Sequence, residues 1–419
     1  MKALWYRQTL SPVVAVVDVG TTKVCTLIGK KGGEGVEILG VGLSSSQGIR
    51  KGKVVDVARA TRAIWESFAL AREVAGEDPE MIYASIAGDF MSSFNLENEI
   101  LLSKSGREVN RRDLEKVVEG ARNSLKLSES RIVHIIPQEY QLDDQKGIAD
   151  PRGMIGSKLK VKVHVVAAQE NHYHNFLKSF SDAGLEVRKI VFQPLASAVA
   201  VLSPMEKEIG TALVDIGGGT TDLAIFYGGS VRFSQVLPIG GEHITSDLAI
   251  GLRTNKEEAE RIKVSQGSVF SRHIRQDEML EVKDLGLSSL QTVSRKYACE
   301  IIEARAKEIL LMIGRGIRDS GFFHSLRGGI VLTGGSSLLD GLSELFSSVS
   351  NFPIRIGYPE SKNFVGNIQT LQNPMFAAAC GLLRQAVNDF FDQETLVSLE
   401  PPNAGKRILG KIKDFFMME

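Results

Sequence analysis

One phrase occurs twice in this chain, and the repetition limits what the chain can fold into. VVAVVDVGTTKVCTLI spans residues 13–28, and TALVDIGGGTTDLAIF spans residues 211–226. Each phrase consists of an apolar run, an aspartate, a short Gly/Thr cluster and a second apolar run, which predicts a strand, a tight turn and a strand. The repetition therefore predicts two similar α/β halves, each of which opens with a strand–turn–strand unit.

The rest of the chain predicts how each half is divided. ATRAIWESFALAREVAG (60–76) has apolar residues at helical spacing, and NPMFAAACGLLRQAV (373–387) is typical of a buried closing helix. Residues 92–162 are more charged and combine one helix with several strands, which predicts a small inserted α+β module. Residues 254–310 are predicted to be helical and charged, forming a second inserted module.

The two Gly/Thr turns have the chemistry of a phosphate site. Glycines let the backbone turn tightly, and concave clusters of N–H groups bind phosphate. Threonine hydroxyls and one lysine add further donors. An aspartate cannot touch phosphate without repulsion, but Asp18 and Asp215 can hold the waters of a Mg²⁺ ion that bridges the phosphates. The predicted phosphate-binding residues are Gly20, Thr21, Thr22, Lys23, Gly217, Gly218, Gly219, Thr220 and Thr221.

Two facing turns would hold a triphosphate from both sides, so the cleft between the halves is the predicted site. Either turn taken alone is also typical of a Gly-rich hairpin without a ligand. The chain has no G-x-x-x-x-G-K-[ST] motif, so a P-loop is not predicted.

A third Gly turn, VLTGGSSLLDG (331–341), fits a strand that ends at a helix N-terminus. Gly334 and Gly335 would let a flat base lie on the backbone, and Ser336 would contact ribose or phosphate. Taken alone, this turn is also typical of an ordinary strand-to-helix connection.

Composition limits the compartment and the partners. Lys and Arg together number 50, as do Asp and Glu, so no overall charge favours nucleic acid, and none is predicted as a partner. Cys25, Cys299 and Cys380 have neither metal-ligand spacing nor a disulfide pattern, which predicts a reducing cytosol. The first residues have no long apolar run, so no signal peptide is expected.

The three turns, in this order, resemble the phosphate-1, phosphate-2 and adenosine motifs of the actin-like ATPases. The resemblance implies two duplicated α/β domains around a nucleotide cleft, with ATP and Mg²⁺ as cofactors. Gln193, in FQPLASAVAV, matches the residue that orients the attacking water in polymerising relatives. Glu260 and Lys263, in EEAERIK, match a helix whose charged side chains contact the nucleoside. An ordinary solvated helix with charges at i and i+3 has the same pattern.

Further segments resemble one family within that class, the FtsA proteins of bacterial cell division. HIIPQEYQLDDQKGIADPRGMIGSKLKVKVHVV (134–166) is similar to the family's inserted IC sub-domain, and SSSQGIRKGKVVD, IGGEHITSDLAIGL and NPMFAAACGLL match its pattern. One departure is TGGSSLLDG, where the family usually has a third Gly and a Pro. The resemblance implies the following units: sub-domain IA at 12–91 and 163–205, IC at 92–162, IIA at 206–250 and 311–388, IIB at 251–310, a linker at 389–403 and an amphipathic helix at 404–419.

The same resemblance implies a function. Family members tether the FtsZ ring to the inner face of the cytoplasmic membrane at midcell, join head to tail into filaments and recruit later membrane proteins of the divisome. ATP hydrolysis varies within the family, so weak or no ATPase activity is expected. Sub-domain IIB binds the acidic and apolar C-terminal peptide of FtsZ, which makes Lys296 and Arg305 possible contacts. Solvated helix charges would have the same pattern. A pilus-assembly scaffold of the PilM type and a sugar kinase of the same superfold are the alternative functions.

The C-terminal segment PNAGKRILGKIKDFFMME (402–419) follows Pro401 and predicts an amphipathic helix that lies in a membrane interface. On a helix its apolar residues fall within an arc of about 120°, and its basic residues lie largely outside that arc. This division suits reversible binding of one copy to anionic lipid and tighter binding of a filament. A terminal helix docked on the protein's own core is the alternative. The predicted membrane residues are Ile408, Leu409, Ile412, Phe415, Phe416, Lys406, Arg407, Lys411 and Lys413.

Overall fold

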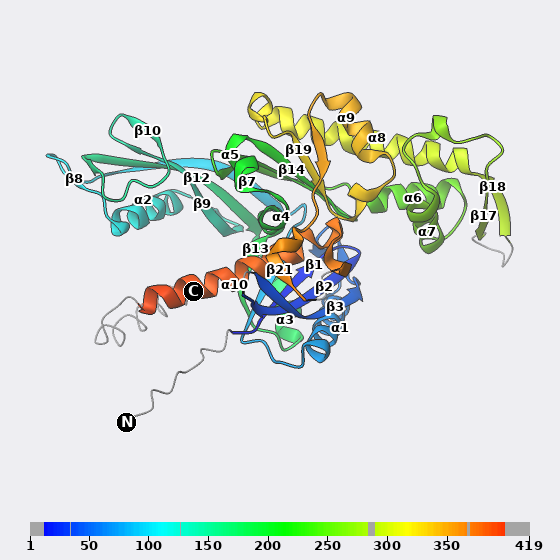
Figure 1. Cartoon of the computed structure of the whole chain (residues 1–419), viewed down its shortest axis with the longest axis horizontal. Coiled ribbons are helices and arrows are strands. Elements are labelled where there is room, and N and C mark those ends of the chain that lie inside the picture. The colour runs from blue at the N-terminus through cyan, green and yellow to red at the C-terminus, as the bar shows by residue number, and fades with distance from the viewer. Residues whose placement is uncertain (1–11, 34, 126, 284–289, 367–368, 399–419) are drawn as a thin grey trace.

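The computed structural model describes residues 12–398, except for residues 34, 126, 284–289 and 367–368. The described chain forms two α/β bodies, each built on its own sheet, which lie one above the other in Figure 1. A strand-rich module extends from one side of the upper body and a mainly helical module from the other. In this part of the chain no helix is long and apolar enough to cross a membrane.

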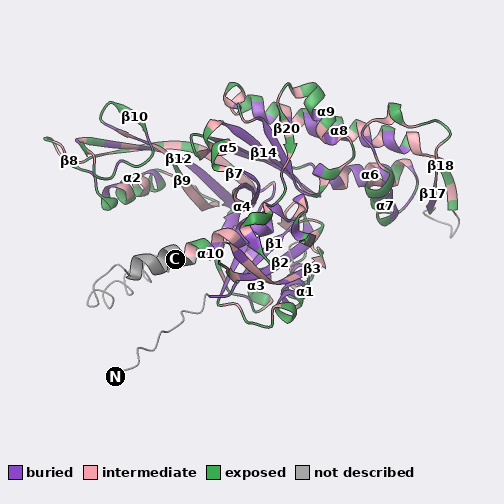
Figure 2. Ribbon diagram, viewed as in Figure 1, coloured by how far each residue is buried: buried purple, intermediate pink, exposed green. Residues whose placement is uncertain are grey.

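The first body is a six-stranded sheet in the order β13-β6-β1-β2-β3-β21. Side chains of β1 alternate between two cores: Val14 and Val16 belong to one, Ala15 and Val17 to the other. Helices α1 and α3 cover one face and α10 the other, so every residue of β1 is buried (Figure 2). The elements are β1 (Val14–Val19), β2 (Lys23–Lys31), β3 (Val36–Ser45), β4 (Ile49–Arg50), β5 (Lys53–Val54), α1 (Val57–Ala75), β6 (Met81–Ile86), α3 (Glu170–Asp182), β13 (Val187–Phe192), β21 (Phe364–Val365) and α10 (Ala377–Ser398).

The second body repeats the connection pattern of the first. Strand β1 pairs antiparallel with β2 and parallel with β6, and β14 pairs antiparallel with β15 and parallel with β19. The two duplicated α/β halves predicted from the repeated phrase are therefore confirmed. Its sheet has the order β16-β15-β14-β19-β20. The elements are α4 (Gln193–Val201), α5 (Pro204–Ile209), β14 (Thr211–Ile216), β15 (Thr221–Tyr227), β16 (Ser230–Leu237), α6 (Gly241–Gly251), β19 (Ile330–Thr333), α9 (Leu342–Ser350) and β20 (Ile354–Ile356).

The first module is a four-stranded sheet in the order β10-β9-β12-β7 with helix α2 on one face and a hydrophobic core of its own. The first and last strands of the module, β7 and β12, join the first body, since Met91 pairs with Ala168 and both pack in a core of that body. The strands therefore extend beyond the predicted limits of 92 and 162. The elements are β7 (Met91–Leu101), β8 (Arg107–Glu108), α2 (Arg111–Asn123), β9 (Ser130–Leu142), β10 (Gln145–Ile148), β11 (Ile155–Gly156) and β12 (Lys158–Gln169).

The second module is less helical than the sequence predicts, because it contains a β-hairpin. Val282 is buried while Glu281 and Thr292 are exposed, which is the alternation of a strand with one solvated face. The strands are only five residues long, and charged neighbours hide their alternation in the sequence. Helix α8 also continues beyond residue 310 into the second body. The elements are α7 (Lys256–Gln266), β17 (Met279–Lys283), β18 (Leu290–Ser294) and α8 (Arg295–Asp319).

The last described helix, α10, is longer than predicted. It continues to Ser398, whereas the sequence predicts a linker from residue 389. The reason is that no proline interrupts the sequence before Pro401, so nothing stops the helix where its buried face ends. The predicted membrane helix at 404–419, with all its listed apolar and basic residues, lies outside the described residues.

Candidate nucleotide-binding site

The two Gly/Thr turns face each other across a cavity of about 460 Å³. In each turn the first glycine donates its N–H to the carbonyl three residues later, at 3.0 Å from Gly20 and 2.9 Å from Gly217. The turns are in contact, because a Cβ added to Gly218 would lie only 2.5 Å from Cγ2 of Thr22. Glycine at this position lets the two bodies approach, and the backbone N–H groups of both turns border one space.

Three buried carboxylates lie behind the turns. Ser85 donates its hydroxyl to Asp18 at 2.5 Å, and Ser197 donates to Asp215 at 2.8 Å. Burial raises the pKa of Asp18, and burial raises the pKa of Asp215 to about 6. Burial, with Asp215 and Asp18 nearby, raises the pKa of Asp222 well above its usual value. The site therefore gathers three carboxyl groups whose charged forms are disfavoured by burial, and a cation bound beside them would favour their ionised forms.

The three carboxylates are better suited to hold a cation through its bound waters than to coordinate it directly. Among the described residues, no three His, Cys, Asp or Glu side chains are arranged to hold a metal ion directly. Asp222 nevertheless has a buried Oδ1 without a hydrogen-bond partner. An orphaned carboxylate oxygen beside Asp18 and Asp215 fits a Mg²⁺ ion that keeps several waters and takes phosphate oxygens as its remaining ligands.

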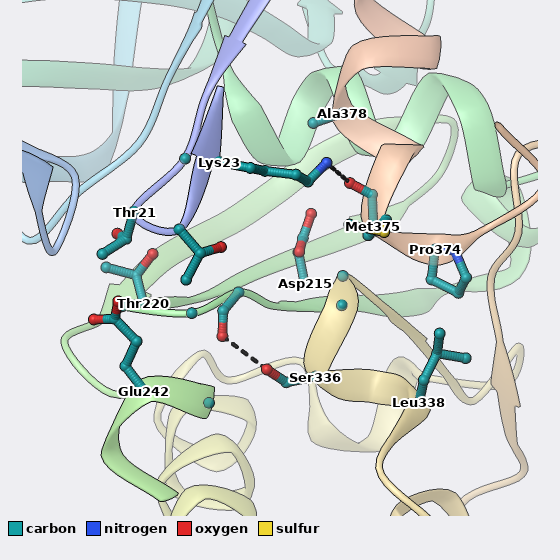
Figure 3. Close-up of a pocket in the computed structure, with 18 of the residues that line it drawn as sticks. Thr21, Lys23, Asp215, Thr220, Glu242, Ser336, Leu338, Pro374, Met375 and Ala378 are labelled. Carbon is teal, nitrogen blue, oxygen red and sulfur yellow. Dashed lines mark hydrogen bonds between the residues drawn. The ribbon is translucent and has the colours of Figure 1, made fainter. Parts of the chain in front are cut away.

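Lys23 lines the cavity, but its ammonium group is directed towards the start of α10. Its Nζ donates to the carbonyl of Met375 at 2.6 Å (Figure 3). The same atom lies 4.2 Å from the centroid of the Phe376 ring. The positive charge of Lys23 also lowers the pKa of Asp18, although burial has the larger effect. Lys23 therefore joins the first turn to the 3-10 turn η6 (Pro374–Phe376), which directly precedes α10.

The third Gly turn completes the floor of the cavity. Gly334 has φ +82°, a left-handed conformation that favours glycine. A short 3-10 turn, η3 (Gly335–Leu338), follows it, so α9 does not begin directly at the glycines as predicted. Ser336 donates its hydroxyl to the carbonyl of Gly217 at 3.0 Å (Figure 3). The adenosine-like turn is thus tied to the second phosphate-like turn.

Glu260 and Lys263 also line the cavity, from helix α7. Lys263 donates to Glu260 at 2.6 Å, to Thr245 at 2.9 Å and to the carbonyl of Gly241 at 3.2 Å. The lysine amine is largely buried, unlike that of a solvated helix charge, since only 11% of its side chain is exposed. The pair therefore holds α7 against the N-terminus of α6.

Most of the predicted nucleotide residues meet in this cavity, together with Gln193 at the first position of α4. Thr221 does not line it: as the first residue of β15 it is fully buried, and its hydroxyl donates to the carbonyl of Ile239 at 2.8 Å. Alternation along the strand turns its side chain away. The sequence reasoning missed Asp222, although it directly follows the Gly/Thr cluster of the second phrase. It also missed other lining residues: Gly241, Glu242, Val264, Leu338, Asn373, Pro374, Met375 and Ala378.

The two cations proposed to contact the FtsZ peptide lie outside this cavity, on α8. Arg305 is engaged: its guanidinium donates to both carboxylate oxygens of Asp247, at 2.6 and 3.1 Å, and also bonds Glu308. Lys296 has no hydrogen bond or ion pair with another described residue and is half-buried. The structure therefore gives Arg305 a role in joining α8 to α6, which a count of charges along the sequence could not reveal.

Comparisons with known proteins find similarity along most of the chain. Residues 212–381 match the family model for Cell division protein FtsA, and residues 88–167 match the model for the SHS2 domain inserted in FtsA. The FtsA of Pseudomonas aeruginosa is 36% identical over 372 residues, which is 88% of each chain. The FtsA of Escherichia coli K12 is 34% identical over 400 residues, 93% of this chain and 94% of that protein.

Two solved structures share the fold at low identity. A chain of the PilM-PilN type IV pilus biogenesis complex aligns with a TM-score of 0.64 and 17% identity, covering 90% of this chain and 99% of that one. MreB5 of Spiroplasma citri bound to ADP aligns with a TM-score of 0.53 and 13% identity, covering 91% and 98%. The fold and its cleft are those of the actin-like ATPases. Within that class, the chain belongs to the FtsA family of cell-division proteins.

Proposed function

We propose that the cleft binds ATP with Mg²⁺. The observation that carries this proposal is the contact of the two Gly/Thr turns in front of three buried carboxylates. In this arrangement the turns donate backbone N–H groups to the phosphates, and the third turn receives the adenosine. Asp18, Asp215 and Asp222 would hold the metal through water, and the metal would neutralise phosphate charge. That MreB5 has been solved bound to ADP supports an adenine nucleotide.

Two substitutions test this site with a fluorescent ATP analogue. Asp215→Ala removes a metal-water acceptor, and Gly218→Asp places a carboxylate against the phosphates and against Thr22. Both should abolish saturable binding, whereas Asp78→Ala should not, because Asp78 is an exposed surface residue with 85% of its side chain accessible. Binding of the analogue to Gly218→Asp with the affinity of the parent would mean that the nucleotide lies elsewhere.

Gln193 is the candidate for orienting an attacking water. It is the first residue of α4 and its side chain lines the cavity. Positioning of water without a strong general base is consistent with weak or no ATP hydrolysis. Gln193→Ala should therefore leave analogue binding unchanged and reduce any phosphate release, measured as a single turnover.

Membership in the FtsA family supports a further role, as a peripheral protein at midcell that tethers the FtsZ ring to the inner membrane and recruits later divisome proteins. The division into sub-domains IA, IC, IIA and IIB belongs to the same proposal. A pull-down with the C-terminal peptide of FtsZ tests it. Lys296→Glu should weaken capture, because an acidic peptide would lose a cation that has no described partner. A chain that retains nucleotide but never captures the peptide would favour a scaffold of the PilM type instead.

Self-association into filaments is proposed to require the first inserted module. Because Met91 and Ala168 are paired neighbours in antiparallel strands, residues 92–167 can be replaced by a short turn without stretching the chain. Deletion of 92–162 alone would leave the end of β12 without its partners. The shorter protein should still bind nucleotide but form no filaments on lipid in electron micrographs; normal filaments would remove the module from the contact.

A further inference from the structure

A second cavity lies where the first inserted module meets both bodies, and it shares no lining residue with the nucleotide cleft. We call it the rear cavity. Its volume is about 490 Å³, within the range of small-molecule sites. Figure 1 shows α4, α10 and the base of the module meeting near the centre of the molecule. It is lined by His134 and Ile136 of β9, Lys189 and Val191 of β13, Leu195, Ala198 and Val199 of α4, Lys207 of α5, Phe226, Gly229, Ser230 and Val231 of the β15–β16 hairpin, and Gln385, Asn388 and Asp389 of α10.

His134 lines this cavity and carries a hydrogen-bond donor. The backbone N–H of Phe192 donates to Nε2 of His134 at 2.9 Å, so Nε2 must be the unprotonated nitrogen. Burial, with a contribution from Lys189, lowers the pKa of His134 to about 4, so the ring is neutral at physiological pH. The proton of the neutral ring therefore sits on Nδ1. Within the described chain, Nδ1 has no hydrogen-bond partner.

The charges around the cavity are also unbalanced. Among the described residues that line it, the one carboxylate is that of Asp389, which is already bound to Lys189 at 2.6 Å. Lys207 forms no ion pair with any described residue, and its Nζ lies 5.8 Å from the centroid of the Phe226 ring. Burial, and then the like charge of Arg384, lowers the pKa of Lys207. A half-buried cation beside a second cation, with no unpaired carboxylate among the described residues that line the cavity, is a place where an anion would be stabilised.

The remaining walls are apolar. Leu195, Ala198 and Val199 form one side of the cavity, and Phe226 and Val231 form another. A free inorganic ion would leave these surfaces in contact with water. We propose that the rear cavity binds a small organic anion whose carboxylate or phosphate group is held by Lys207 and by Nδ1–H of His134, with its apolar part against α4. The proposal does not depend on nucleotide binding.

Binding here would reach the nucleotide site through one hydrogen bond. The same His134 ring that faces the anion accepts the N–H of Phe192, which immediately precedes Gln193. Helix α4 also carries Ser197, the donor to Asp215. The ligand would therefore contact His134, which accepts the N–H at the start of α4. This helix carries Gln193, which lines the cleft, and Ser197, which bonds one of its carboxylates.

Octyl phosphate, used below its micelle concentration, is the first probe. We expect saturable binding by calorimetry and an affinity about tenfold lower in Lys207→Gln, which removes one charge-assisted hydrogen bond. Asn388→Glu changes an exposed lining residue and should weaken binding by adding a negative charge. Lys178→Gln, on the exposed face of α3, is the matched control and should bind as the parent does. Melting temperatures of all four proteins show whether each variant is folded.

Other probes define the chemistry. Equal affinity for octyltrimethylammonium would overturn the charge assignment, and equal affinity for inorganic phosphate would overturn the role of the apolar walls. Tighter binding of dihexanoyl phosphatidate than of octyl phosphate would identify a lipid head group as the source, and weaker binding would identify a free metabolite. No saturable binding, or no difference between the parent and Lys207→Gln, would refute the site. The fluorescent ATP analogue is titrated in parallel, so a failure here is distinguished from a failure of the nucleotide proposal.

Discussion

Replacing Gly334 by alanine tests whether the third turn and the carboxylates form one site. Gly334 has φ +82°, where an L-residue is less stable than glycine by about 1–2 kcal/mol. The added Cβ would also overlap the Asp215 carboxylate and lie 2.6 Å from the carbonyl oxygen of Ile216. The second contact is with backbone, so a side-chain rotation cannot relieve it. The third turn would have to move away from β14.

We expect Gly334→Ala to lower the free energy of unfolding by at least about 2 kcal/mol and ATP affinity by about 30-fold, since a displaced turn no longer meets the phosphates. Urea unfolding measures the first quantity and titration with a fluorescent ATP analogue the second. Gly33→Ala is the matched control, because a Cβ there meets nothing within 4 Å. The reasoning would be refuted if Gly334→Ala unfolded at the same urea concentration as the parent and bound the analogue equally well.

Other predictions concern charged side chains and the C-terminal segment. Because burial raises the pKa of Asp215 to about 6, binding of Mg²⁺ and ATP should weaken as pH falls from 7 to 5, and equal affinities at both pH values would contradict this. In the ligand-free protein the sign is opposite: the stability that comes from protonating Asp215 is fully present below its ordinary pKa of 3.8 and is lost as pH rises through 6. Arg305→Ala should reduce stability by about 1 kcal/mol, since the lost pair is partly exposed, whereas Lys296→Ala should leave urea unfolding unchanged. Phe415→Glu should release the protein from anionic liposomes without loss of ATP binding, and unchanged sedimentation with the liposomes would exclude the tail as the anchor.

Much of the nucleotide site could be predicted because its parts are local. Each Gly/Thr turn lies between two strands of the same hairpin, so an apolar run, an aspartate and a glycine cluster specify both the backbone path and the position of the acid. The third turn is equally local. Asp222 escaped prediction because it lies inside a strand, where only its orientation towards Asp18 and Asp215 separates it from an ordinary buried polar residue.

The predictions that differ from the structure concern residues whose conformation or contacts depend on tertiary packing rather than on the local sequence pattern. The β17–β18 hairpin is too short for its alternation to stand out from its charged neighbours, and it is ordered against α7 and α8. Thr221 shares the composition of the other turn residues, but strand geometry turns it into the core. Arg305 has the spacing of a solvated helix charge, and only the approach of α6 gives it Asp247 as a partner.

Local sequence patterns were enough to predict two similar halves, a hairpin with an acid before a glycine turn at the start of each half, and one cleft shared by the halves. These features depend on hydrophobic periodicity and turn chemistry, which act over a few residues. Packing between the bodies, in contrast, brings Gly218 against Thr22 and lets His134 accept the N–H at the start of α4. It also leaves Lys207 beside a cavity without a described carboxylate partner. Such contacts join residues far apart in the chain, and they exist only after two sheets and an inserted module have packed together, so no local pattern records them.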